Sequence, residues 1–88
     1  MTTSVTKQQL HVRVSRATEV LWEGDAQSVS SENSEGPFDI LPMHANFITI
    51  VEKKPIVLDK NTVSEQSFKF DKAVLFVRNN TVRVFADL

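Results

Sequence analysis

Short apolar runs separated by turn-forming residues limit what this chain can fold into more than any other feature. From Gln9 to Arg16, apolar side chains occupy every second position, which is typical of a half-buried strand. Ala73 to Val77 is apolar at every position and has turn residues on both sides, so we expect a strand covered on both faces. No long stretch carries a helical stripe. Strands recur about every 8–12 residues, which predicts an all-β domain built as a sandwich or flattened barrel.

Turn residues divide the rest of the chain. Gly24-Asp25 follows an apolar run that ends in Trp22, and it signals a hairpin. Ala26 to Glu32 is rich in serine and predicts an edge-like strand, with its serine cluster read as a solvated strand end rather than a phosphorylated loop. Val63 to Phe70 predicts a strand with two phenylalanines on one face. Asn79-Asn80 can adopt the left-handed conformations of a tight turn.

The stretch from Glu35 to Asn46 combines a glycine turn, a short strand and a proline corner. Glu35-Gly36 predicts a tight hairpin turn, because glycine supplies backbone freedom that other residues lack. Pro42 has no backbone N–H to donate to a sheet, so it is expected to end the strand before it. Met43 and His44 then lie at a loop tip, where partners are usually met.

Bulk composition indicates one small globular domain. The 88 residues carry ten basic and eleven acidic side chains, a net charge of −1. That balance argues against nucleic acid and anionic lipid as main ligands, since both need a basic patch. Cysteine is absent, so no disulfide or thiolate metal site can form. We expect residues 1–8 to be a polar, flexible lead-in and residues 9–88 to be the folded domain, with no direct membrane insertion.

The residues suited to catalysis are few. His11 and His44 are the only histidines, and they lie far apart in the sequence. His11 is expected on a strand surface. No glycine elbow marks a nucleophilic serine, and two glycines cannot build a phosphate cradle. We therefore expect no enzyme activity, no cofactor, no metal and no small-molecule substrate, which leaves a role in binding other proteins.

The stretch around the proline corner resembles the epsilon subunit of F-type ATP synthases. That family's N-terminal domain has a pattern close to S-E-G-x-x-x-I-x-P-x-H-A-x-x-x-T. The matching residues here are Ser34, Glu35, Gly36, Ile40, Pro42, His44, Ala45 and Thr49. Val14-Ser15 is similar to the end of the family's first strand, Gly24 to its first hairpin, and residues 82–87 to its closing strand.

The resemblance implies a ten-strand sandwich of two sheets that serves as a rotor subunit. Such a subunit is not catalytic. It couples rotation of the membrane c-ring to the gamma subunit of the central stalk, as a peripheral protein on the cytoplasmic face. The residues implied at the c-ring are Glu35, Gly36, Pro42, Met43, His44 and Ala45, and those implied at gamma are Val14 and Ser15.

Several positions depart from the family. Met43 replaces the usual glycine of the corner, and Asn46 replaces the usual proline. This sequence ends where the family usually continues into an inhibitory two-helix hairpin. If 88 residues is the natural length, the protein is expected to couple rotation without that hairpin. The alternative is a stand-alone β-sandwich binding module with a different partner. His44 likewise has two interpretations: a corner residue bonded to its own backbone, which the residues alone favour, or an interface residue, which the resemblance favours.

Overall fold

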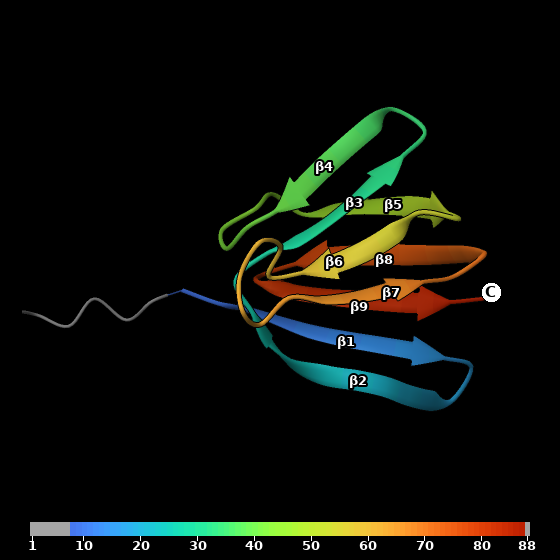
Figure 1. The fold of residues 1–88 in the computed structure, drawn as a ribbon, viewed down its shortest axis with the longest axis horizontal. Helices are drawn as coiled ribbons and strands as arrows, with labels where there is room; N and C mark the ends of the chain where they lie inside the picture. The colour runs from blue at the N-terminus through green and yellow to red at the C-terminus, as the bar shows by residue number, and fades with distance from the viewer. Residues whose placement is uncertain (1–7, 88) are drawn as a thin grey trace, which may run out of the picture.

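The computed structural model describes residues 8–87, which form nine strands and no helix. In chain order the strands are β1 Leu10–Arg16, β2 Glu19–Ala26, β3 Val29–Asn33, β4 Gly36–Ile40, β5 Phe47–Glu52, β6 Pro55–Leu58, β7 Gln66–Lys69, β8 Lys72–Arg78 and β9 Thr81–Ala86 (Figure 1). Gln8 is the one residue of the predicted lead-in that is described; residues 1–7 lie outside the described part.

The strands form two sheets. One has five strands in the order β2-β1-β9-β8-β5, and the other has four in the order β4-β3-β6-β7. Neighbouring strands are antiparallel except β1 and β9, which are parallel. The prediction of an all-β sandwich of two sheets is confirmed. Nine strands lie between residues 8 and 87, where the resemblance implied ten.

The core lies between the sheets and follows the alternation of the sequence. Leu10, Val12 and Val14 of β1 point inward and are fully buried, as their spacing predicts. The same alternation buries the inward side chains of β8 and β9. The buried cluster consists of Leu10, Val12, Val14, Ala26, Val29, Ile40, Val51, Ile56, Leu58, Ala73, Leu75, Val77, Val82 and Val84.

Aromatic pairs join the two sheets along both open sides of the sandwich. Trp22 of β2 packs against Phe68 of β7, with ring centroids 6.4 Å apart. On the other side Phe38 of β4 meets Phe47 of β5 edge to face at 5.6 Å. Such pairs stabilise by about 0.5–1.5 kcal/mol beyond the area they bury. The sheets are therefore tied at their margins as well as through their core.

Gly24 lies within β2, so the prediction of a hairpin at Gly24-Asp25 is wrong. The first hairpin turns at Ala17 and Thr18, where Ala17 has a left-handed φ of 52°. The reason for glycine is packing: a Cβ on Gly24 would lie 3.0 Å from the Trp22 ring. Gly24 makes room for the indole that crosses to the other sheet.

Two other strands differ from their predictions. β3 is not at an edge but lies between β4 and β6, because its serines find partners: Ser30 Oγ donates to Asp39 at 2.5 Å and Ser31 Oγ to the Pro55 carbonyl at 2.9 Å. β7 begins at Gln66, since the residues before it form a loop in which Val63 is exposed. The predicted Asn79-Asn80 turn is confirmed, with φ of 49° and 60°.

Candidate partner-binding surfaces

The proline corner is a compact loop that presents Met43 to solvent. The His44 N–H donates to the Leu41 carbonyl at 3.1 Å, which closes a turn around Pro42 and Met43. Met43 has φ of 71° and its side chain is 75% exposed. That φ disfavours residues other than glycine, so methionine here carries a backbone cost of about 1–2 kcal/mol.

Two asparagine side chains hold the corner against the β8–β9 hairpin. Asn80 Oδ1 accepts a hydrogen bond from the Met43 N–H at 2.7 Å. In the reverse direction, Asn46 Oδ1 accepts from the Asn79 N–H at 3.3 Å. The corner is thus fixed to the five-stranded sheet, and Asn46, which replaces the family's proline, makes one of the two bonds.

His44 is bound to its own corner. Its Nδ1 lies 2.7 Å from the Ala45 carbonyl oxygen, and its ring meets Phe47 edge to face at 5.3 Å. The backbone hydrogen bond expected from the residues alone is therefore present. The imidazole remains half-exposed at the loop, so this bond does not by itself remove it from a surface that a partner could touch.

The Glu35-Gly36 turn lies at the far end of β4 from the corner, as Figure 1 shows. Ser34 and Glu35 form the turn, the Glu35 N–H donates to Asn33 Oδ1 at 2.9 Å, and Gly36 has φ of 121°. The strand of five residues separates turn and corner by about 15 Å. The residues implied at the c-ring are therefore split between two ends of the sandwich and do not form one patch.

Val14 and Ser15, the residues implied at gamma, are both buried. Val14 belongs to the core and is 0% exposed. Ser15 is 9% exposed, and its Oγ donates to the Val84 carbonyl at 3.5 Å; the pairing of β1 with β2 shifts register between Val14 and Ser15. Their side chains shape the strand and offer little surface to a partner.

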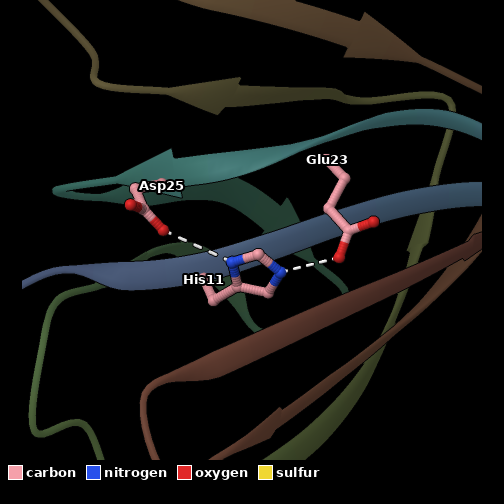
Figure 2. A network of polar contacts seen from close by, with 3 residues as sticks. All are labelled: His11, Glu23 and Asp25. Atoms are coloured by element: carbon pink, nitrogen blue, oxygen red, sulfur yellow. Dashed lines mark hydrogen bonds and ion pairs between the residues drawn. The ribbon is translucent and has the colours of Figure 1, made fainter.

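β1 and β2 carry a polar network that the sequence does not predict, formed by His11, Glu23 and Asp25 (Figure 2). His11 Nε2 lies 2.7 Å from Glu23 Oε2, and Nδ1 lies 3.3 Å from Asp25 Oδ1. Hydrogen bonds to Glu23 and then to Asp25 raise the pKa of His11, and the bond to His11 lowers the pKa of Glu23. His11 is exposed, as predicted. Its partners could not be predicted, because a turn at Gly24-Asp25 would not place Glu23 and Asp25 beside His11, as the observed register does.

The clustering of histidine, serine and acidic side chains can be checked over the described residues. Within residues 8–87, no three histidine, cysteine or acidic side chains converge as metal ligands would. Ser30 bonds Asp39, but no histidine joins them to complete a triad. No helix between residues 8 and 87 is long and apolar enough to traverse a bilayer.

Comparison with known proteins identifies the fold and the family. The fold resembles a chain of the Euglena gracilis mitochondrial ATP synthase OSCP/F1/c-ring structure, with a TM-score of 0.78, 11% identity and 89% of this chain covered. It also resembles a chain of the Tetrahymena thermophila mitochondrial ATP synthase central stalk/c-ring structure, with a TM-score of 0.72, 14% identity and 93% covered. The match spans only 50% and 66% of those two chains.

The sequence itself matches a protein family over almost its whole length. Residues 9–88 match the family described as the beta-sandwich domain of the ATP synthase Delta/Epsilon chain. The all-β fold with two packed sheets agrees with that description. This chain belongs to the ATP synthase delta/epsilon beta-sandwich family.

Proposed function

We propose that this protein is a non-catalytic rotor subunit of an F-type ATP synthase that joins the c-ring to the gamma subunit of the central stalk. The family match over residues 9–88 is the observation that carries the proposal. The two structural relatives are chains of ATP synthase structures that include the c-ring, which supports the same assignment. In this role the protein sits peripherally at the cytoplasmic face of the membrane.

The physical task of such a subunit is to pass torque without deforming. A close-packed core transmits strain with little compression, and aromatic pairs on both sides resist sliding of one sheet over the other. Both proposed contacts lie on short, anchored loops. The corner is held by two asparagine side chains, and the Glu35-Gly36 turn is closed by Asn33.

We assign the two ends of β4 to different partners because they differ in chemistry. The turn end is charged: Glu35, Lys53 and Lys54 are exposed, and Lys54 Nζ lies 4.0 Å from Glu32 Oε2. That end suits the polar loops of a c-ring. The corner end presents the apolar tips Leu41 and Met43, which suit a contact with the shaft. Val14 and Ser15 then act by shaping β1 and not by touching gamma.

A second candidate, a stand-alone binding module with a different partner, is favoured by one observation. Met43 adopts a left-handed φ in place of the family's glycine, so the corner's shape is held at a cost. A changed partner would account for methionine at the tip. Exchanging Met43 for glycine would then weaken the new partner's binding and leave any contact with gamma unaffected.

Co-purification tests the proposed function directly. A tagged chain is expressed with the gamma subunit encoded in the same genome, and the complex is measured by gel filtration and titration calorimetry. A stable complex is expected at micromolar concentration, with an interface near or above ~1,000 Å². Absence of a complex at those concentrations would overturn the assignment to the rotor. Tagged β-sandwich protein of unrelated family serves as the control for non-specific capture.

A further inference from the structure

The outer face of the five-stranded sheet carries an apolar strip that no described residue covers. Ile48 of β5 is 66% exposed and Phe76 of β8 is 39% exposed. Ile50 lies on the same face and is exposed, whereas Val74 and Phe85 are half-buried. The sequence predicts that β8 is covered on both faces, but the core covers only Ala73, Leu75 and Val77.

Strand register turns these residues into a continuous strip. Ile48 pairs with Phe76, and Ile50 pairs with Val74. Val74 in turn pairs with Phe85, and the Phe76 and Phe85 rings meet edge to face at 5.4 Å. A groove of about 980 Å³ lies over the part of the strip formed by Ile48, Phe76 and Phe85, and it reaches Asn46 and Asn79 beside the corner. The strip is therefore continuous with the corner that we assign to the shaft.

Arginine side chains border the strip. Arg83 pairs across the sheet with Phe76, and Arg78 precedes the β8–β9 turn; both line the groove. Among the described residues the ion pairs involve His11, Arg16 and Lys54, and neither groove arginine takes part. Of the acidic side chains near the strip, Glu23 and Asp25 of β2 are bonded to His11, and Glu52 lies beyond Ile50 on β5, opposite Lys72. The border formed by Arg83 and Arg78 is thus positive and, among the described residues, free to pair with a partner's carboxylates.

We propose that this strip binds one amphipathic helix of a partner protein, whose apolar stripe is bordered by acidic residues that pair with Arg83 and Arg78. A sheet that is apolar on its second face is normally covered by helices. The strip spans β5, β8 and β9, two strand spacings or about 10 Å, which matches the diameter of one helix. That the helix belongs to the gamma subunit rests on the proposed function.

Surface variants measured against gamma test the strip within the complex. Ile48→Asp places a charge in the apolar strip, and Arg83→Glu reverses the border. Each is expected to weaken binding about tenfold or more, and Arg83→Glu should also flatten the dependence of binding on salt. Both residues are exposed, so folding is checked simply by circular dichroism and melting.

Matched controls make the same chemical changes elsewhere. Val63→Asp adds a charge at an exposed apolar residue of the β6–β7 loop, and Lys69→Glu reverses a charge on β7 of the other sheet. Both controls are expected to bind as the natural sequence does. If Ile48→Asp and Arg83→Glu also bind as the natural sequence does, gamma still identifies the rotor subunit, but the strip is not its binding surface.

A designed peptide tests the strip even if gamma does not bind. The probe is a 20-residue helix with a leucine stripe bordered by glutamates, and its control carries lysines at the glutamate positions. The full chain is expected to bind the acidic peptide at least tenfold more tightly than the basic one, and Arg83→Glu is expected to reverse that preference. Equal binding of the two peptides, or no binding, would overturn the inference independently of the rotor assignment.

Discussion

At the scale of single residues, a few side chains settle local structure through contacts that their type alone does not indicate. Position 24 requires glycine because the Trp22 ring occupies the space that a Cβ would need. Asn80 combines a left-handed backbone with a hydrogen bond to Met43. His11 lies between two carboxylates on the neighbouring strand. Each of these contacts can be removed by one substitution that leaves the other contacts in place.

Gly24→Ala is expected to destabilise the fold by about 1–2 kcal/mol, because the new methyl group forces the Trp22 ring to shift in a packed site. Chemical denaturation measures the loss, and tryptophan emission in the native state reports the ring. Gly36→Ala is the control. It strains a φ of 121° but meets no atom within 4 Å, so it should cost stability without changing Trp22 emission. Identical emission changes in both variants would contradict the packing account.

Glu23→Gln is expected to lower the pKa of His11, because the hydrogen bond to Glu23 is the main reason that this pKa is raised. The raised pKa of His11 contributes stability that is present below its ordinary value of 6.5 and is lost as pH rises through the folded value. The lowered pKa of Glu23 contributes stability that is present above 4.5 and is lost as pH falls through the folded value. The contact is therefore strongest between those limits.

Histidine ring resonances measured by NMR across this pH range test the pair. Glu19→Gln, a glutamate on the same strand outside the network, is the control and should leave the His11 titration unchanged. An unchanged His11 pKa in Glu23→Gln would show that the two side chains do not interact in solution.

At the scale of elements, alternation and turn chemistry decide what the sequence can predict. β1 and β9 follow from their apolar period, β8 from its continuous apolar run, and Asn79-Asn80 from its tolerance of left-handed φ. The turn at Ala17 could not be predicted, because alanine disfavours the left-handed conformation it adopts there. Because the predicted turn was at Gly24-Asp25, neither the register of β2 nor the partners of His11 could be predicted. Partners of the candidate surfaces depend on the tertiary arrangement, which no local pattern encodes.

Asn80→Gly is expected to release the corner from the β8–β9 hairpin. Glycine accepts the left-handed φ of 60°, so the variant removes only the side chain that accepts from the Met43 N–H and donates to Gln8. Loss of the Met43 bond should cost about 0.5–1.5 kcal/mol and speed hydrogen exchange at the Met43 amide. Asn79→Gly keeps the hydrogen bond from the backbone N–H of residue 79 to Asn46 Oδ1, so it should leave the Met43 amide protected from exchange. Equal exchange in both variants would contradict the proposed anchor.

At the scale of the whole molecule, the sandwich separates two chemically different ends by the length of its strands. The β3–β4 turn and the corner between β4 and β5 belong to opposite ends, although they are close in sequence (Figure 1). One end is rich in exposed charge and the other presents apolar tips. The rotor role that we propose uses these two ends separately, one for the ring and the other for the shaft.

Single-cysteine cross-linking tests this separation, because the natural sequence contains no cysteine. In the assembled rotor, Glu35→Cys is expected to cross-link to the ring subunit and Met43→Cys to gamma. A reagent shorter than about 10 Å reports only partner groups close to each cysteine, and the two positions lie ~15 Å apart, so two different partners should give different products. Lys69→Cys, on β7 of the four-stranded sheet, provides the control for chance collision. Cross-linking of both Glu35→Cys and Met43→Cys to the ring subunit, with no product to gamma, would contradict the assignment of the two ends of β4 to different partners.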